Sequence, residues 1–442
     1  MLNWDDPLSK TTPSAVTASI PPSADTLSAE ALSAEAPLHE AEPQSLAASY
    51  AASGVLGGMD FDGSSLEEKG VVLPGSTPEA AAPTPADAKL AEQAIEGIER
   101  DQAEIADSIA PVKASDKRVI NGEADVNQLA PFKYPWAWEY FLNANKNHWT
   151  PLDINMAQDV QDYQHKLNDA EKHVYTNVLA YLTTSDILAM RNIGLAVMEK
   201  MTAPELQIYQ ARQVYEEALH TWTYQHCIET IGLDQGEIYN RYRVVPAING
   251  KIQLANRRLD SVMRSDMNLK NPDDLNEFVM AYTFFAGIFE GTWFYNGFTP
   301  IFSLQRRGLM KGTSEQLQYI MRDEVMHASF GIRVVKQIML ENNVTLDPKA
   351  IREMWDESEA AEQAYSHYIL KNPILGYTAE DHIEQFRFIA NRRARQLGME
   401  EPFPGAQNRS AWLDEQANMK KEKNFFETRV TEYQTGGALD WG

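Results

Sequence analysis

Apolar positions recur at helical spacing through most of the central part of this chain. Between about residues 155 and 370 this spacing predicts helices almost without a break. Short separators rich in Gly, Pro, Asn, Asp and Thr interrupt the pattern at 202–204, 232–234, 271–273 and 312–314. Two further helices are predicted over 347–371 and 379–397, and strand-like alternation is scarce. The sequence therefore predicts an all-α protein.

The two ends of the chain differ from this helical part in composition. Residues 1–85 are rich in Ala, Ser, Pro and Glu and poor in aromatic residues, so we expect them to be disordered. Residues 86–108 have helical spacing and form a possible helix, and the aromatic and proline-rich segment 130–154 is predicted as an irregular arm packed on the helices. We therefore expect a disordered extension (1–115), a helical domain (116–424) and a flexible C-terminal tail (425–442).

Two of the predicted helices carry the same acid and histidine pattern. Glu217 and His220 are three residues apart, as are Glu324 and His327, so each pair lies on one helix face. In both helices this face is the apolar stripe. A carboxylate that faces a protein core is costly unless it is paired or binds a metal ion.

Each of these pairs follows a carboxylate in apolar helical sequence, Asp186 for the first and Glu290 for the second. A carboxylate and then a Glu-x-x-His from each of two helix pairs is the ligand set of a di-metal site in a four-helix bundle. Four carboxylates and two neutral imidazoles also balance two divalent cations, and this donor set suits iron or manganese. The longer interval from Glu217 to Glu290 predicts one extra helix and a crossover between the halves. A buried network of ion pairs without metal is the alternative interpretation.

Four apolar or aromatic residues are expected around this site. Tyr224 lies four residues after His220 on the same face, where a redox-active metal pair could remove one electron from its phenol. Phe294, Phe298 and Ile320 could form a dry wall around that phenol. Ordinary core packing is the simpler interpretation of each of these three residues alone, and a hydrogen-bonded core tyrosine is the alternative for Tyr224.

Composition excludes several classes of function. The formal charge of −24 argues against binding to nucleic acids or anionic membranes. The single cysteine, Cys227, allows no disulfide within the chain and favours a reducing compartment, the cytoplasm. The N-terminus lacks the pattern of a secretory signal. The apolar stretch 278–302 contains Glu290, so we interpret it as a helix buried in the bundle and not as a membrane span.

On these residues, the chain from about Lys117 to Gly442 resembles the small (beta) subunit of class I ribonucleotide reductase. The resemblance implies a ferritin-like four-helix bundle with extra helices. It also assigns the ligands of two metal ions: Asp186, Glu217 and His220 for the ion nearer the tyrosine, and Glu290, Glu324 and His327 for the other.

The resemblance further implies roles in radical chemistry. Tyr224 corresponds to the tyrosine that holds the stable radical, and Trp149 to the tryptophan that starts radical transfer. Asp323 corresponds to the aspartate that links this tryptophan to His220. Tyr433 corresponds to the tyrosine that passes the radical to the large subunit.

The implied enzyme is ribonucleoside-diphosphate reductase. Its small subunit holds two iron ions, with two manganese ions as the alternative and no organic cofactor, and activates dioxygen to form the radical. We expect a homodimer that docks on the large (alpha) subunit through residues 425–442, and no nucleic-acid or membrane partner. A chain with one cysteine lacks the dithiol that reduces the ribonucleotide, so that reduction belongs to the large subunit.

Three other functions remain open on the residues alone. A di-iron oxygenase or oxidase could use the same bundle, but it needs neither Tyr224 nor a tail with Tyr433. An iron-storage protein would be expected to be a much shorter chain. A structural helical protein without metal is the third alternative.

Overall fold

The computed structural model describes residues 112–413. Most of the predicted N-terminal extension, including the possible helix 86–108, lies outside the described residues. So does the predicted tail with Tyr433.

Residues 112–413 form an all-α structure, which confirms the predicted fold class, and no strand occurs among them. The α-helices are α3 (Pro135–Ala144), α4 (Ala157–His165), α5 (Asp169–Asn192), α6 (Met198–Lys200), α7 (Pro204–Ile231), α8 (Gln235–Val244), α9 (Pro246–Leu259), α10 (Pro272–Thr283), α11 (Tyr295–Arg306), α12 (Lys311–Asn342), α13 (Pro348–Ile369) and α14 (Ala379–Leu397). Two π-helical segments, η4 (Ile193–Val197) and η6 (Phe284–Phe294), interrupt the α-helical pattern. Short 3₁₀ turns are η2 (Ala114–Asp116), η3 (Pro151–Asp153) and η5 (Asp260–Met263).

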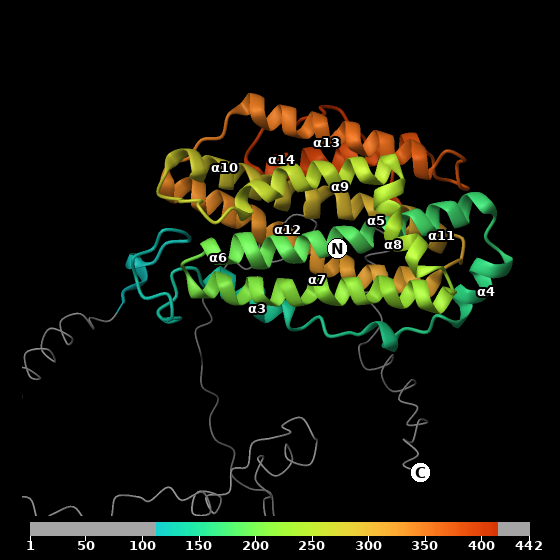
Figure 1. Ribbon diagram of the computed structural model, residues 1–442, viewed down its shortest axis with the longest axis horizontal. Coiled ribbons are helices and arrows are strands. Elements are labelled where there is room, and N and C mark those ends of the chain that lie inside the picture. Colours follow the sequence, from blue (N-terminus) through green and yellow to red (C-terminus); the bar gives the residue numbers. More distant parts are fainter. Residues whose placement is uncertain (1–111, 414–442) are drawn as a thin grey trace, which may run out of the picture. The chain divides into compact units, whose positions relative to one another are not determined.

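Four long helical elements form the core bundle. Helix α5 packs along α7, and η6 packs along α12. Contacts of α7 with α12 and of α5 with α11 join the two pairs. Figure 1 shows α5 and α7 side by side, with α13 and α14 on the opposite side of the molecule. Two helices, α8 and α9, lie between the halves of the sequence, where one extra helix was predicted.

The apolar stretch around Glu290 is buried as predicted. From Phe278 to Leu304 every side chain except Met280 is buried. Among residues 112–413, none of the helices combines the length and apolar character that a membrane span needs.

Glu290 lies inside the π-helical segment η6, whose wide turns are specified by its own residues. Thr292 donates its hydroxyl hydrogen to the carbonyl oxygen of Gly287, five residues earlier, at 2.7 Å. A Cβ atom on Gly291 would lie 2.4 Å from the carbonyl oxygen of Ala286, so this position excludes a side chain. The buried Arg393 of α14 donates Nε–H to the Gly291 carbonyl at 2.7 Å. Isolated π-helical turns often mark functional sites, and this one carries Glu290.

The predicted irregular arm 130–154 contains a regular helix, α3, so that part of the prediction was wrong. Pro135 occupies the first turn of α3, where its missing N–H is not needed. The remote Glu205 of α7 accepts hydrogen bonds from the backbone N–H groups of Lys133 and Tyr134 at 3.0 and 3.1 Å. The acceptor is distant in sequence, so no local capping pattern predicts the start of α3.

The separator predicted at 312–314 was also wrong, because α12 already begins at Lys311. The buried carboxylate of Asp159 accepts hydrogen bonds from the backbone N–H groups of Gly312 and Thr313 at 2.8 and 2.7 Å. A side chain of α4 therefore caps the helix that carries Glu324 and His327. Glycine and threonine at these positions serve this close approach and do not break the helix.

Substitution of Gly331 by alanine should destabilise the bundle. A Cβ atom there would lie 2.5 Å from Cβ of Ala286, so α12 and η6 would have to separate. Overpacking of this kind costs ~1–3 kcal/mol in free energy of unfolding. Gly250→Ala in α9 is the matched control, because its Cβ meets no atom within 4 Å. Thermal unfolding followed by circular dichroism should show a lower midpoint for Gly331→Ala only; equal midpoints would contradict this packing.

Candidate metal centre

The six predicted ligands converge from the four core elements. Asp186 comes from α5, Glu217 and His220 from α7, Glu290 from η6, and Glu324 and His327 from α12. All six side chains are completely buried. Their donor atoms form two overlapping groups, each with its atoms within 4.8 Å of one another: Asp186, Glu217 and His220 in one, and Glu217, Glu290, Glu324 and His327 in the other.

Glu217 and Glu324 lie between the two histidines. Nδ1 of His327 is 3.1 Å from Oε1 of Glu217 and 3.5 Å from Oε2 of Glu324. Nδ1 of His220 is 3.6 Å from Oε2 of Glu217 and 3.3 Å from Oε1 of Glu324. Each of these two glutamates therefore has one oxygen near His220 and the other near His327. Glu217 belongs to both groups of donor atoms, and the assignment of three ligands to each ion stays a prediction.

Asp186 and Glu290 lie at the two outer sides of the cluster. Each has an oxygen 3.9 Å from the nearer Nδ1, that of His220 for Asp186 and that of His327 for Glu290. Gln213 of α7 donates an amide hydrogen to Oε1 of Glu290 at 2.7 Å, which fixes that carboxylate.

The donor atoms that face the centre of the cluster have no hydrogen-bond partners. These are both oxygens of Asp186, Glu217 and Glu324, Oε2 of Glu290, and Nδ1 of His220 and His327. Buried polar atoms in proteins are normally paired. Unpaired atoms of this kind on four carboxylates and two imidazoles are the donor set expected for a pair of divalent cations, so the residues fit such a metal centre.

Mutual repulsion and burial shift the pKa values within the cluster. Burial, followed by the charge of Glu217, raises the pKa of Asp186 well above its ordinary value. Burial likewise raises the pKa of Glu290. Burial also acts to raise the pKa of Glu217, but His220 and His327 outweigh it and lower that pKa to about 2. Burial and neighbouring negative charges therefore disfavour the ionised forms of the two outer carboxyls, Asp186 and Glu290.

The Nε2 atom of each histidine contacts a carboxylate on the helix that carries the other Glu-x-x-His pair. Nε2 of His220 lies 3.1 Å from Oδ2 of Asp323, and Nε2 of His327 lies 2.8 Å from Oε2 of Glu216. Arg212 donates to the other oxygen of Glu216 at 2.8 Å. Carboxylates in this position fix the ring orientation of metal-binding histidines.

Glu216 is a residue that the sequence analysis missed. A signal was present, because both motifs read acid-Glu-x-x-His: Glu216 precedes Glu217 as Asp323 precedes Glu324. The structure shows why the repeat is longer than Glu-x-x-His. The first acid of each motif binds the histidine of the other.

Tyr224 is completely buried on α7, on the Asp186 side of the cluster. Burial and then the charge of Asp186 raise the pKa of its phenol well above the ordinary value, with a smaller contribution from Glu324. Phe294, Phe298 and Ile320 are also completely buried. Their role as a wall around the phenol stays a prediction.

The predicted link from Trp149 through Asp323 to His220 is made only in part. Asp323 contacts His220, but its other oxygen accepts a hydrogen bond from the amide of Asn147. The ring of Trp149 stacks on Tyr319 with centroids 5.3 Å apart, and its indole N–H has no hydrogen-bond partner. Asn147 therefore holds the position that the prediction gave to Trp149.

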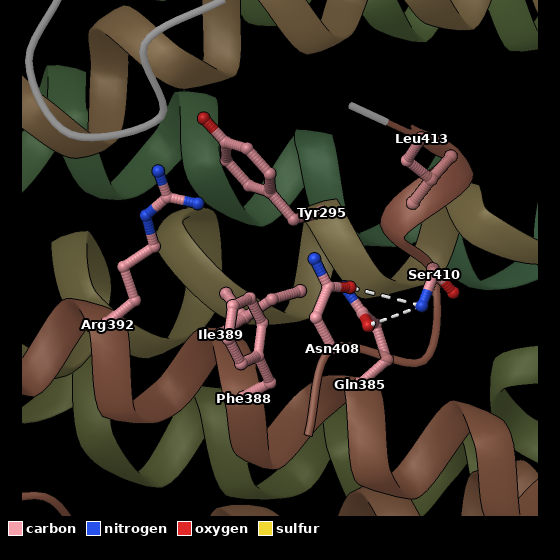
Figure 2. Close-up of a pocket in the computed structure, with 8 residues that line it drawn as sticks. All are labelled: Tyr295, Gln385, Phe388, Ile389, Arg392, Asn408, Ser410 and Leu413. Carbon is pink, nitrogen blue, oxygen red and sulfur yellow. Dashed lines mark hydrogen bonds between the residues drawn. The ribbon is translucent and has the colours of Figure 1, made fainter. Parts of the chain in front are cut away.

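A small pocket lies apart from these ligands, where the described chain ends (Figure 2). The side chains of Gln385 and Asn408 converge on the backbone nitrogen of Ser410, which donates to both at 3.1 Å. The pocket is lined by Tyr295, Gln385, Phe388, Ile389, Arg392, Asn408, Ser410 and Leu413. None of the six predicted ligands lines it, so it is no part of the candidate metal centre.

Solved structures support the fold. The R2 subunit of ribonucleotide reductase from Clostridium botulinum matches with a TM-score of 0.63 at 23% identity, over 68% of this chain and 94% of that one. A dimanganese(II)-NrdF from Streptococcus sanguinis matches with a TM-score of 0.51 at 18% identity, over 64% of this chain and 94% of that one.

Sequence comparisons extend this likeness to the family. The ribonucleoside-diphosphate reductase subunit beta of Chlamydia pneumoniae is 36% identical over 346 residues, which cover 77% of this chain and 100% of the relative. The small subunit from Dictyostelium discoideum is 29% identical over 325 residues, 73% of this chain and 90% of the relative. The family model of the ribonucleotide reductase small chain matches residues 126–411. With the buried carboxylate and histidine cluster in place, these matches show that the chain belongs to the family of ribonucleotide reductase small subunits.

Proposed function

We propose that this chain generates and stores an oxidising radical on Tyr224 for a ribonucleoside-diphosphate reductase. The observation that carries the proposal is the convergence of six buried ligand side chains, whose inward-facing donor atoms are unpaired, in a bundle that also buries the Tyr224 phenol. In the holoenzyme, the radical is passed to the large subunit, where the ribonucleoside diphosphate is reduced to the deoxyribonucleotide needed for DNA replication. The Chlamydia pneumoniae relative is named for the diphosphate reaction, which supports this substrate.

Asp186, Glu217, His220, Glu290, Glu324 and His327 are the proposed ligands of the metal pair. We propose two iron ions, because carboxylates with imidazole suit iron, although the same donors suit manganese. A bound redox-active pair supplies, together with dioxygen, the oxidising power that the phenol requires.

The chain's own residues then determine where the electron and proton go. Tyr224 loses one electron, and Asp186, the carboxylate that acts most strongly on the phenol, accepts its proton. Complete burial of Tyr224 excludes the water and reductants that would quench the oxidised phenol.

The proposed transfer path leaves the centre through His220 and Asp323 and continues to Trp149. Asn147 occupies the oxygen of Asp323 that Trp149 would need, so this step requires Asn147 to give way. Tyr433, outside the described residues, would carry the radical across to the large subunit.

We propose that the protein is a cytoplasmic homodimer. The single cysteine supports a reducing compartment. Large apolar side chains that stay exposed on α5, η4 and α7 support a second copy as partner: Ile187, Leu195, Tyr215 and Trp222.

The alternative, a di-iron oxygenase or oxidase, is not favoured by the family assignment. An oxidase would use the metal centre without Tyr224. Substitution of Tyr224 should therefore abolish the function of a radical-storing subunit but not that of an oxidase.

Replacement of Tyr224 by phenylalanine should abolish the radical and leave the metal centre filled. The phenol is the group oxidised, and phenylalanine removes only its hydroxyl. Electron paramagnetic resonance after addition of iron(II) and dioxygen, together with metal analysis, checks this. Tyr175→Phe is the matched control, because this buried tyrosine on α5 pairs with Thr313 and not with a ligand. An unchanged signal in Tyr224→Phe would show that another residue holds the radical.

Replacement of Glu216 by alanine should weaken binding of the metal ion held by His327. Loss of such an outer hydrogen-bond acceptor typically costs about 10–100-fold in metal affinity. Titration against a chelator of known affinity should show one weakened ion in Glu216→Ala and the other in Asp323→Ala. Glu237→Ala on the surface of α8 should change neither affinity. Retention of both ions at parent affinity in Glu216→Ala would contradict the role of this residue.

Deletion of residues 425–442 should abolish binding to the large subunit, because this tail is the proposed docking segment. The metal content should stay at the parent value, since all six proposed ligands lie within 112–413. Surface plasmon resonance with immobilised large subunit checks the affinity. Full-affinity binding by the truncated chain would place the docking surface elsewhere.

A further inference from the structure

A second buried charged cluster lies in the same bundle and contains none of the proposed metal ligands. Lys251 of α9 and Glu362 of α13 are both completely buried, with Nζ 2.6 Å from Oε2. The other carboxylate oxygen, Oε1, lies 2.8 Å from Nε2 of His382 and accepts a hydrogen bond from the amide of Asn296 at 2.7 Å. A buried lysine is costly even when it is paired, so its presence here calls for an explanation.

Three aromatic rings enclose the ammonium group of Lys251. Its Nζ lies 3.9 Å from the ring centroid of Tyr181, 4.5 Å from that of Tyr365 and 4.7 Å from that of Trp293. All three rings are completely buried. One such contact within about 6 Å is a recognised cation–π interaction, and here three share one cation.

Two of these rings belong to elements that carry proposed metal ligands. Tyr181 precedes Asp186 on α5, and Trp293 follows Glu290 in η6. The charges of Glu362 and of Asp186 both act on the pKa of Tyr181, which lies well above its ordinary value chiefly through burial. The Tyr181 phenol is therefore within electrostatic reach of both the lysine cluster and the candidate metal centre.

Tyrosine and tryptophan are the side chains that lose an electron most readily, so these rings compete with Tyr224 for any oxidant made at the metal centre. A competing ring would give up one electron to the dioxygen-derived oxidant, and its O–H or N–H proton would then have to leave. The phenol oxygens of Tyr181 and Tyr365 and the indole nitrogen of Trp293 make no hydrogen bond of normal geometry. The phenol oxygen of Tyr224 makes no such bond either, but the charged group that acts most strongly on it is Asp186, whose oxygens are unpaired. The charged group that acts most strongly on Tyr181 and Tyr365 is Glu362, which is already paired with Lys251.

We propose that Lys251 is an electrostatic shield: its ammonium group, held over the faces of Tyr181, Tyr365 and Trp293 by Glu362, disfavours removal of an electron from these rings and so directs oxidation to Tyr224. A positive charge beside a ring raises the energy of the positively charged state that electron loss creates. The opposing charge of Glu362 is shared with His382 and Asn296 on its other oxygen. This inference rests on the proposed function, because it needs an oxidant at the metal centre.

The double variant Lys251→Met/Glu362→Gln tests the shield, because it removes the cation without leaving a carboxylate unpaired in the core. Glu362→Gln alone is the matched control, since it removes the carboxylate and leaves the lysine side chain among the rings. Full-length proteins are loaded with iron(II), checked for equal metal content and exposed to dioxygen. The Tyr224 radical is then measured by electron paramagnetic resonance, and oxygen addition to the three rings by peptide mass spectrometry.

We expect the double variant to show several-fold more oxidation of Trp293 or Tyr181 and a several-fold lower yield of the Tyr224 radical. Addition of Trp293→Phe to the double variant should restore part of the yield. Parent-like ring oxidation in the metal-loaded double variant would overturn the proposal. Peptide mapping needs no radical at Tyr224, so it tests the shield separately from the proposed function.

A second measurement does not depend on the folding of the double variant. Trp293→Phe in the otherwise unchanged protein should leave the yield of the Tyr224 radical at the parent value, because a shielded ring takes no oxidising equivalents. A higher yield in this variant would show that Trp293 competes with Tyr224 even when Lys251 is present, which contradicts the shield.

Discussion

The structure depends on one electrostatic constraint, the packing of four carboxylates and two imidazoles against one another in a fully buried core. Their inward-facing atoms have no hydrogen-bond partners, so the arrangement is unfavourable unless cations fill the space between them. The burial that makes these ligands energetically costly is also what suits them to the proposed function. It keeps the donors in place before any ion arrives, and it keeps Tyr224 away from solvent beside them.

Two contacts between α7 and α12 hold the histidines in place against the repulsion within this cluster. Glu216 of α7 holds the histidine of α12, and Asp323 of α12 holds the histidine of α7. Each motif helix therefore orients a ligand of the other. On the remaining side, Arg393 binds the π-helical backbone next to Glu290. Lys251 is a second buried charge in the same bundle, here a positive one. Glu362 and three aromatic rings stabilise it.

The ligand set and the fold class could be predicted from the sequence because they depend on local periodicity. Glu-x-x-His on an apolar stripe is visible without knowledge of neighbouring helices. Features made by remote contacts could not be predicted in this way. The caps that Glu205 and Asp159 provide for α3 and α12 come from other helices. The place of Glu217 in both groups of donor atoms, and the contact of Asn147 with Asp323 where Trp149 was expected, likewise arise only when the helices are packed. Glu216 could be predicted only in part. The repeated acid-Glu-x-x-His pattern is visible in the sequence, but its contact with His327 is not.

The most direct test of the central claim is a crystal structure of the metal-loaded protein with anomalous scattering recorded at the absorption edge of the metal. The account predicts two peaks between Asp186 and Glu290, about 3.5–4 Å apart as in other two-metal sites, with Glu217 or Glu324 between them. One peak, or none within reach of these six side chains, would contradict it.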